Sequence, residues 1–576
     1  MNHQHAFLFA PIYLPLLGSA LILLCKAVFS KKIRRIAEYG GMIIGMALPL
    51  IIVFSLLEEI EDQGAIIAVL GSWSQNIGIV YRFDGLSFLM IVLAITITIP
   101  SWIYSRKVGP GHSSFTALLL IQNSSIAAIS MTGDLFNLFV CLEVMGVVAS
   151  VLISSSQKGS AVYAAFSYLM ISSSAMVFFL LGTFGLYRLT GSLSYEGIAV
   201  GLSTLGPESN PLIIACLALI VVPVLLRVAI MPLSLWLVDA HSKAPHAVSA
   251  ILSGVLLKVP LFALIRVLSL SEPGLSLGLP ISYAGAATAL LGVVLALSQS
   301  DGKQLLAYHS ISQIGYVVSA WGLAISHGIE TGVGIILLAS SFFHAFSQAL
   351  FKALLFLSVG TVVDASGNGN VYTLRGANRY LKNRGERLPI TMICFFVGAL
   401  SITAIPPFNG FFSKNLLTYT LKENFHYNLL TVAGAGTVAS FIKLSRIFLP
   451  GKNQTDMQED DVQAKFPLTI HLALCILALL CLGTGLFAEQ VIQFISSLLP
   501  GMQNVNVETS FFYKSDTVWK TFWTVAGGIA LFASSITKGG KKILTLLKHC
   551  RGGFTDLFLG FAVALSALSL YLLAFV

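Results

Sequence analysis

Long apolar segments separated by short polar loops run along almost the whole chain. A helix needs about 20 mostly apolar residues to cross a bilayer, and windowed hydropathy predicts about sixteen such segments. Alternation of apolar and polar residues over ~10-residue stretches, which marks a membrane β-barrel, is not seen. The pattern therefore predicts an all-α polytopic membrane protein. The approximate centres of the predicted spans are Leu16, Ala47, Val92, Ser125, Val144, Phe179, Val224, Leu257, Leu290, Val317, Leu350, Ala399, Ala433, Ile476, Gly527 and Ser566.

Composition narrows the class of protein further. Charged residues make up 10% of the 576 residues, whereas soluble domains contain about 25%. The formal net charge of +9 would suggest nucleic-acid binding in a soluble protein, but here the basic residues lie in short loops. The seven cysteines are scattered, without a CxxC pair or a Cys/His cluster. We therefore expect no nucleic-acid partner, no metal site, no disulfide framework and no cofactor in this chain.

The distribution of basic residues predicts the orientation in the membrane. Basic loops follow the odd-numbered spans, and the positive-inside rule places such loops in the cytoplasm. Both termini are then predicted on the outer side of the cell inner (plasma) membrane. The first span, from about Phe7 to Phe29, lacks a basic stretch before it and is expected to be a retained helix. The polar stretch from Lys452 to Lys465 is expected to be a solvated loop. The basic residues that follow spans 1, 3, 5, 7, 11 and 15 include Lys31, Lys32, Arg34, Arg35, Arg106, Lys107, Lys158, Lys243, Arg375, Arg379, Lys382, Arg384, Arg387, Lys538, Lys541, Lys542, Lys548 and Arg551.

Several ionisable residues lie deep inside the predicted spans. A charge at the bilayer centre costs about 2.5–3.5 kcal/mol on insertion scales, and such residues usually face the protein interior and serve transport. A structural ion pair is the alternative for the acid and for the lysines and arginine, and an interfacial histidine is the alternative for His309. His344, Gln348 and Lys352 fall on one helix face, which favours a polar track. The candidate proton-path residues are Glu143, Arg227, Lys258, His309, His344, Gln348, Lys352 and Lys414.

Prolines inside two spans predict broken helices. Pro232 interrupts span 7, and Pro406 and Pro407 interrupt span 12. Broken helices at membrane depth are typical of ion sites in transporters built from inverted repeats. Arg227 precedes its proline and Lys414 follows its proline pair, an order expected for two repeats of opposite orientation. We predict N-terminal helices 1–3 in residues 1–104, a first five-helix repeat in 113–270 (helices 4–8), a second in 280–450 (helices 9–13), and helices 14–16 in 465–576.

Several motifs resemble one known family. The residues are similar to the antiporter-like subunits shared by respiratory complex I, Mrp-type Na⁺/H⁺ antiporters (their D subunit) and membrane-bound hydrogenases. The similarity covers span 3 to span 13. The motifs that carry it are Gly133-Asp134-Leu-Phe-Asn-Leu-Phe-Val-Cys-Leu-Glu143, Trp236-Leu-Val-Asp239-Ala, Ala244-Pro245…Lys258, Leu305-Leu-Ala-Tyr308…Tyr316, His344…Phe351-Lys352-Ala-Leu-Leu-Phe and Pro406-Pro407…Lys414.

The resemblance implies roles for the candidate residues. Glu143, Lys258 and Lys414 match the glutamate of span 5 and the lysines of spans 8 and 12 in the proposed proton path of the family. His344 and Lys352 match the span-11 residues that connect its two half-channels. Arg227 occupies the place of a lysine, and a guanidinium does not lose its proton in proteins. Gln348 stands where several members have histidine, and its amide can still order water.

Three functions remain open at this stage. The first is a proton-translocating subunit, or one that exchanges Na⁺ for protons, in a larger membrane complex such as an NADH:quinone oxidoreductase or a hydrogenase. The second is the D subunit of an Mrp-type monovalent cation/proton antiporter. The third is a carrier in which the buried lysines bind an organic anion. The chain shows no redox or hydrolytic motif of its own, so whether it belongs to an enzyme complex is left open.

Overall fold

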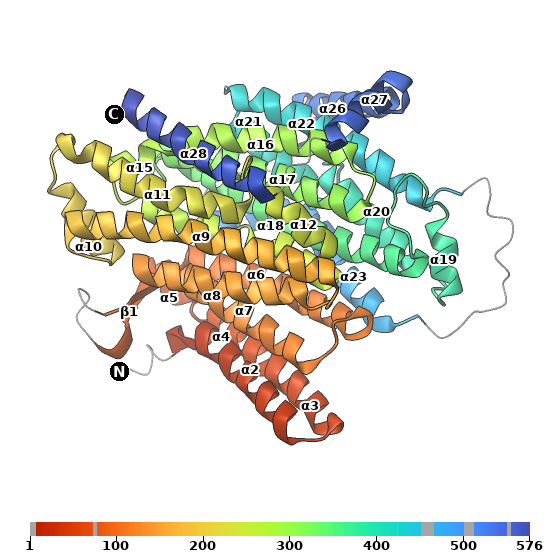
Figure 1. Cartoon of the computed structure of the whole chain (residues 1–576), viewed down its shortest axis with the longest axis horizontal. Helices are drawn as coiled ribbons and strands as arrows, with labels where there is room; N and C mark the ends of the chain where they lie inside the picture. The colour runs from red at the N-terminus through yellow and green to blue at the C-terminus, as the bar shows by residue number, and fades with distance from the viewer. Residues whose placement is uncertain are drawn as a thin grey trace.

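Helices dominate the structure and lie roughly side by side along one direction of the molecule (Figure 1). A computed structural model describes residues 7–72, 78–422, 424–450, 466–499, 512–549 and 554–575. The predicted polar loop from Lys452 to Lys465 lies outside these ranges. The N-terminal elements are α2 (Ala10–Val28), α3 (Lys31–Met42), a π-helical turn (Ile43–Ala47), α4 (Leu48–Ser55), α5 (Leu57–Gln63), β1 (Ala65–Val69), a 3₁₀ turn (Leu70–Ser72), β2 (Val80–Asp84) and α6 (Gly85–Val108).

The middle of the chain forms the bulk of the bundle. Its first half contains α7 (Ser113–Met131), α8 (Leu135–Ser154), α9 (Gly159–Thr190), α10 (Tyr195–Ser203), a 3₁₀ turn (Pro207–Ser209), α11 (Asn210–Val228), α12 (Leu235–Lys243), α13 (His246–Ile251), a π-helical turn (Leu252–Leu256) and α14 (Val259–Leu268). Its second half contains α15 (Glu272–Ser276), α16 (Gly278–Ser298), α17 (Gly302–His327), α18 (Gly332–Ser366), α19 (Ala377–Asn383), α20 (Ile390–Ile402), α21 (Asn409–Thr420), α22 (Phe425–Ser445) and a 3₁₀ turn (Arg446–Phe448).

The C-terminal helices pack around this core at several places. They are α23 (Leu468–Leu486), α24 (Ala488–Ser497), α26 (Ser515–Ile536), α27 (Lys538–His549) and α28 (Phe554–Phe575). α26 lies against α22, α27 lies beside α16, and α28 crosses over α11 and α12 (Figure 1). The start of α2 and the end of α28 lie at the same end of the bundle, on the left of Figure 1.

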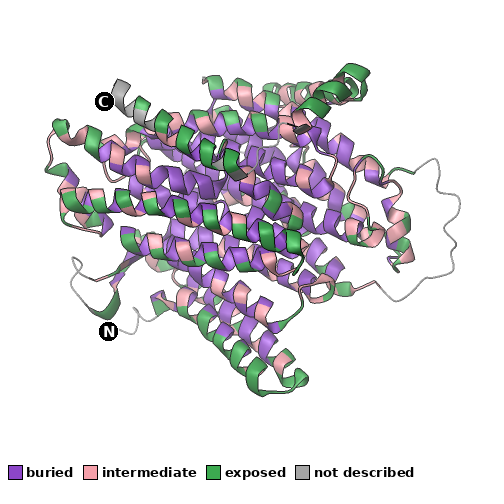
Figure 2. Cartoon of the chain, in the orientation of Figure 1, coloured by how far each residue is buried: buried purple, intermediate pink, exposed green. Residues whose placement is uncertain are grey.

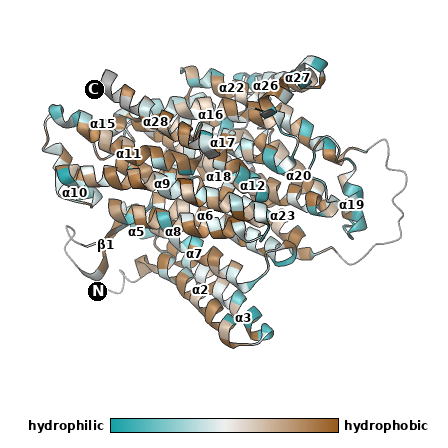
Figure 3. Ribbon diagram, in the orientation of Figure 1, coloured by the Kyte–Doolittle hydropathy of each residue, from teal (hydrophilic) through white to brown (hydrophobic). Residues whose placement is uncertain are grey.

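The surface of the bundle is suited to lipid. Figure 2 shows buried residues concentrated in the middle of the molecule, and Figure 3 shows brown, apolar residues along the sides of its helices. In the described part of the chain, eleven helices are long and apolar enough to cross a membrane. The predicted span centres fall within helices, with the exception of Leu257. The prediction of a helical multi-pass membrane protein is therefore confirmed.

The two proline-containing breaks have the same local backbone. Residues 229–232 and 404–407 both read Ala-Ile-x-Pro, and they separate α11 from α12 and α20 from α21. The alanine lies in the left-handed region in each case, with φ of 63° and 59°. The following isoleucine donates its amide to the carbonyl five positions earlier, at 3.1 and 3.0 Å. This hydrogen bond ends a helix in the manner of a Schellman motif.

A third interruption, which the sequence analysis did not predict, lies at Leu257 and Lys258. The π-helical turn ends at Leu256, and α14 begins at Val259 with Pro260 in its first turn. Proline lacks the amide that would continue the hydrogen-bond ladder, and π-helical turns often accompany functional sites. Lys258 therefore stands at a helix junction rather than in the middle of a regular helix.

A β hairpin packs at the end of the bundle where α2 begins. β1 and β2 are antiparallel, with Ala65 opposite Asp84. Asp84 caps α6 by accepting the Ser87 amide at 3.0 Å, and Arg266 of α14 donates to it at 2.6 Å. Burial by itself raises the pKa of the Asp84 carboxyl, but the charges of Arg266 and Arg82 and the Ser87 hydrogen bonds outweigh it and lower this pKa below its usual range.

We expect Arg266→Gln to destabilise the protein because it leaves the Asp84 carboxylate buried without its main cation. The expected loss is about 3 kcal/mol at neutral pH. A carboxyl with a lowered folded-state pKa stabilises the fold above its unfolded pKa, and this contribution disappears as pH falls through the folded pKa. The difference in thermal midpoint from the wild type, measured in detergent, should therefore shrink below about pH 4. Arg82→Gln is the matched control: its side chain is 44% exposed, so its loss should cost at most about 1 kcal/mol.

A buried polar axis as the candidate functional site

Glu143 on α8 and Arg227 on α11 form an ion pair between Oε1 and Nη2. The other terminal nitrogen of Arg227 donates to the carbonyl of Leu142 at 2.8 Å, and Ser173 donates to the second Glu143 oxygen at 3.2 Å. The Arg227 side chain is 2% exposed and that of Glu143 is 26% exposed. A Cβ atom at Gly146 would lie 2.6 Å from Arg227 Nη1, so the guanidinium sits where only glycine leaves room. The pair is a fixed contact in which both terminal nitrogens of Arg227 are used.

Lys258 begins a chain of hydrogen bonds that crosses three elements. Its Nζ donates to the carbonyl of Ser253 at 2.6 Å, and the hydroxyls of Ser253 and Ser310 are 2.8 Å apart. Ser310 donates to the carbonyl of Leu306 at 3.2 Å, and the same carbonyl accepts a hydrogen bond from Lys352 Nζ. All five residues are fully buried. The structure thus connects the helix junction at Lys258 with α17 and α18.

One face of α18 carries three of the predicted residues. His344, Gln348 and Lys352 follow one another at a spacing of four and are fully buried. His344 Nδ1 lies 3.1 Å from the hydroxyl of Ser413 on α21, which is the residue before Lys414. The face of α18 therefore runs from Lys352 in the Lys258 chain to the neighbourhood of Lys414.

The buried residues Lys258, Lys352, Gln348, His344 and Lys414 together form a series that we call the buried axis. Lys414 lies at its end, beside the second proline break. Its Nζ donates to the carbonyl of Ile402, the last residue of α20, at 2.6 Å. The same ammonium group lies 5.1 Å from the centre of the Tyr316 ring. Tyr316 in turn donates to the carbonyl of Leu430 at 2.5 Å. The break supplies the acceptor, because a carbonyl in the last turn of a helix has no partner within the helix.

The buried lysines share one kind of partner. Lys258, Lys352 and Lys414 each donate to a backbone carbonyl, and so do Lys303 (to Ala244, 2.6 Å) and Lys443 (to Gln299, 2.5 Å). Among the described residues, none of these lysines takes part in a salt bridge. A carbonyl stabilises an ammonium ion less than a carboxylate does, and it leaves no stranded anion when the lysine becomes neutral. These lysines are therefore suited to changing their charge.

Polar atoms without a protein partner accompany the lysines. Both ring nitrogens of His241 and His309, and both amide atoms of Gln313 and Gln348, are buried and have no hydrogen-bond partner in the protein. Buried polar groups are normally satisfied, and ordered water supplies the partner where protein does not. His309 is fully buried and lies beside Phe441, with 5.1 Å between the ring centres. We expect water along this part of the axis.

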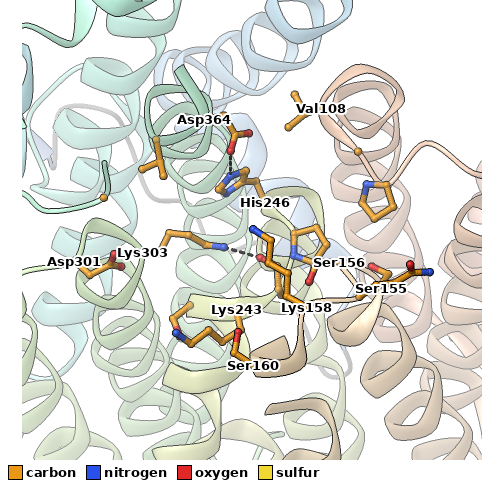
Figure 4. Close-up of a pocket in the computed structure, with 18 of the residues that line it drawn as sticks. Val108, Ser155, Ser156, Lys158, Ser160, Lys243, His246, Asp301, Lys303 and Asp364 are labelled. Carbon is orange, nitrogen blue, oxygen red and sulfur yellow. Dashed lines mark hydrogen bonds and ion pairs between the residues drawn. The ribbon is translucent and has the colours of Figure 1, made fainter. Parts of the chain in front are cut away.

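A cavity opens at the end of the bundle that carries the basic loops. Its volume is about 670 Å³, and it is lined by the loops before α7, α9, α13 and α17 and by the end of α18. His246 Nε2 lies 3.1 Å from Asp364, and Lys303 reaches the cavity from α17. Figure 4 shows the contact between His246 and Asp364 and the hydrogen bond from Lys303 to the Ala244 carbonyl on the cavity walls. The end of Lys158 lies between these two contacts in this view. Lys303, which lines the cavity, lies within electrostatic range of buried His241.

Sequence reasoning missed several polar residues. His241 on α12 is fully buried, stacks on Phe356 at 4.7 Å, and lies within electrostatic range of Lys303, Lys258 and Lys352. Its place in a short helix after the break, close to a basic loop, gave no signal of burial. Lys443 is buried near a helix end, where long side chains usually reach solvent. Lys520 on α26 was missed as well.

The described residues contain no group of three or more His, Cys, Asp or Glu side chains placed to hold a metal ion. The arrangement instead consists of buried cations, hydroxyls and carbonyls joined in series. Chemically it is able to pass protons between lysines through hydroxyls and water, because a hydroxyl both donates and accepts.

Comparison of the sequence with known protein families shows which family the chain belongs to. The family described as NADH:quinone oxidoreductase/Mrp antiporter, transmembrane, matches residues 132–443, which is more than half of the chain. The chain belongs to this family. The matched region contains every predicted proton-path residue, whereas Lys520 lies beyond its end. The resemblance inferred from the motifs is thereby confirmed.

Individual relatives agree with the family assignment. The chain is 30% identical over 441 residues to the N subunit of the NADH-quinone oxidoreductase of Desulforudis audaxviator, covering 73% of this chain and 84% of the relative. It is 29% identical over 492 residues to the D subunit of the Na(+)/H(+) antiporter of Alkalihalophilus pseudofirmus, covering 84% and 94%. A chain of the Mrp complex from Dietzia sp. DQ12-45-1b has the same fold, with a TM-score of 0.73, 20% identity, and coverage of 91% and 100%.

Proposed function

We propose that this chain is a proton-translocating membrane subunit of a multisubunit complex and moves protons along the buried axis. The observation that carries the proposal is the set of buried contacts that joins Lys258 to Lys352. It comprises the carbonyl and hydroxyl of Ser253, the hydroxyl of Ser310 and the carbonyl of Leu306. It lies within the region that the family matches. A bare proton does not cross about 30 Å of hydrocarbon, so titratable groups joined by hydroxyls and water provide the route.

In this mechanism the proton moves between buried lysines that each contact a backbone carbonyl, which does not relay protons. A proton therefore leaves the ammonium of Lys258 through water, passes along the Ser253 and Ser310 hydroxyls, and reaches neutral Lys352 through a second water. The face formed by Gln348 and His344 then leads toward Lys414. Repulsion between neighbouring ammonium groups favours release at one position once another is charged.

Arg227 acts differently from the lysines. Its guanidinium keeps its proton, and it contacts Glu143. We propose that this pair sets the electric field at the start of the axis and that protons join the axis at Lys258 or beyond. The cavity beside Lys303 and His246 supports this route, because it admits water to the basic end of the bundle without passing Arg227.

The proposed topology has sixteen spans, with the basic end in the cytoplasm and both termini on the outer side of the inner membrane. It includes two inverted five-helix repeats, from α7 to α14 and from α16 to α22. The shared Ala-Ile-x-Pro motif at 229–232 and 404–407, with the same backbone hydrogen bond, supports the equivalence of spans 7 and 12. The position of Arg227 before its break and of Lys414 after the other supports their opposite orientation.

The second candidate is the D subunit of an Mrp-type cation/proton antiporter. The antiporter relative is covered over 94% of its length, more than the relative named for NADH-quinone oxidoreductase. Both candidates use the same axis and require other membrane subunits as partners. They differ in the energy source, which is a redox reaction in one and an ion gradient in the other.

The test is purification of the native complex, identification of its partners, and reconstitution into proteoliposomes with a pH-sensitive dye inside. A redox substrate that acidifies or alkalises the lumen supports the first candidate. Proton movement driven only by a Na⁺ gradient supports the second. Absence of both kinds of movement from an intact complex would contradict the proposal.

We expect Arg227→Lys to retain transport. The substitution keeps a cation beside Glu143 and restores the residue type found in the family, although lysine cannot contact Glu143 and Leu142 with two nitrogens at once. The initial rate of proton movement should stay within about threefold of the wild type, a change of less than 1 kcal/mol. Arg227→Gln, which removes the cation, is the matched comparison and should be clearly slower. Loss of transport in Arg227→Lys would show that the dual contact itself is required.

A further inference from the structure

α26 places a half-buried lysine, Lys520, against the end of the proposed path. Lys520 lies in the first two turns of this helix, and its Nζ donates to the hydroxyl of Thr418 on α21. The Thr418 hydroxyl donates to the carbonyl of Lys414 at 2.7 Å. Lys520 Nζ also lies 5.0 Å from the centre of the Tyr427 ring on α22. The Thr418 hydroxyl therefore contacts both the Lys520 ammonium group and the backbone of Lys414.

The two lysines line the same small cavity. Its volume is about 40 Å³, and its walls include Tyr316, Lys414, Thr418, Thr431, Lys520 and Thr524. A polar cavity needs only about 10–15 Å³ to hold a water molecule. The lining offers several hydroxyls, so water placed here finds the partners that it needs. The cavity thus joins Lys414 to Lys520 by a short polar route.

A line of residues continues from this cavity to solvent. Lys414, Thr418 and Lys422 follow one another at a spacing of four, which places them on one side of α21 and its end. Lys414 and Thr418 are buried, whereas Lys422 is exposed. Lys520 lies within electrostatic range of Lys422. Lys520 is therefore placed between the last buried lysine of the axis and an exposed lysine.

We propose that Lys520 carries the proton from Lys414 to the surface at this end of the bundle. The idea rests on the proposed function of the axis. An N–H bond of the Lys414 ammonium breaks, its proton passes through water in the cavity, and a new N–H bond forms on neutral Lys520. Lys520 then gives its proton to solvent beside Lys422, whose positive charge favours the release. Each step moves one proton and involves no other bond and no electron transfer.

Lys520 belongs to one of the C-terminal helices, α26, and the proposed proton transfer to the surface therefore depends on that helix. The family matches residues 132–443, and Lys520 comes from a helix beyond that region. α26 packs along α22 and presents Lys520 to α21. The conducting path is then completed by a helix outside the two proposed repeats.

Three variants of the purified complex in proteoliposomes test the proposal. Lys520→Met removes the amine, and Lys520→Arg keeps a cation that does not release its proton. Both are expected to slow proton movement by about tenfold or more. Lys538→Met, just beyond the far end of the same helix, removes an exposed lysine and should leave the rate unchanged. Wild-type rates in Lys520→Met or in Lys520→Arg would overturn the proposal, since the second would show that a fixed charge suffices.

Chemical modification of a cysteine at position 520 separates the role of the amine from any effect of the substitution on folding. The reagent acts on protein that is already assembled. Lys520→Cys is treated with either 2-aminoethyl or 2-(trimethylammonio)ethyl methanethiosulfonate. The first adduct carries an amine that exchanges a proton, and the second carries a permanent cation. Transport should recover with the first reagent only, with wild-type protein treated in parallel to account for native cysteines. Equal recovery with both, or recovery with neither, would contradict the proposal.

The same assay separates this inference from the proposed function. If Lys258→Ala abolishes proton movement and Lys520→Met does not, the axis conducts but Lys520 takes no part in it. If Lys258→Ala transports at the wild-type rate, the proposed function itself is wrong and Lys520 has no path to complete.

Discussion

Lys258→Ala is expected to abolish proton movement by the chain. Lys258 is the fully buried first member of the series that reaches Lys352 through Ser253, Ser310 and Leu306. Alanine leaves no titratable group at the helix junction, and water alone does not hold an excess proton at that depth. The initial rate in proteoliposomes should fall by about 100-fold or more, the range in which a positioned proton-transfer group contributes.

A surface lysine provides the control for this variant. Lys382 on α19 is exposed and belongs to a basic loop, so Lys382→Ala should transport at the wild-type rate. The amount of each variant that assembles with its partners is measured by affinity purification before the assay. An intact Lys258→Ala complex that pumps normally would rule out the lysine series as the route.

Glu143→Gln is the second variant for which we expect a large loss. Glutamine has the same size but no charge, so the guanidinium of Arg227, which is 2% exposed, remains buried without a counter-ion. A buried charge that loses its partner is destabilised by about 3–5 kcal/mol. We expect Arg227 to shift toward solvent or a neighbouring carbonyl, and coupled transport to fall by about tenfold or more.

Ser173→Ala distinguishes the charge of Glu143 from its hydrogen bonding. It removes only the hydroxyl that donates to the second carboxylate oxygen at 3.2 Å, so its effect should be within about threefold. If Ser173→Ala is as slow as Glu143→Gln, the orientation of the carboxylate matters more than its charge. If Glu143→Gln transports normally, the ion pair with Arg227 is structural only.

The positions of the helices were predictable because membrane insertion depends on local hydrophobicity. Each stretch of about 20 apolar residues has to form a helix in lipid to satisfy its backbone, and the predicted centres accordingly fall on helices such as α8, α16 and α22. The breaks at Pro232 and Pro407 were predictable from the missing proline amide. The junction at Lys258 was not, because the π-helical turn from Leu252 to Leu256 has no comparable sequence signal.

The candidate site was predictable only within single helices. The spacing of four between His344, Gln348 and Lys352 fixes a common face of α18. The contact between the Ser253 and Ser310 hydroxyls depends on how α17 packs against the helix junction, and periodicity along one helix carries no information about such packing. For the same reason Lys520, far away in sequence, was not associated with Lys414.

The pairing of buried lysines with backbone carbonyls has a consequence for how such a chain can change over time. A carbonyl remains whatever side chain stands opposite it, so Lys258, Lys352 or Lys414 can be exchanged one at a time without requiring a matching change elsewhere. The Glu143–Arg227 pair is different, because a change in either residue leaves a charge behind. Ion preference and rate can therefore be tuned residue by residue along the lysines, while the Glu143–Arg227 pair has to change as a unit.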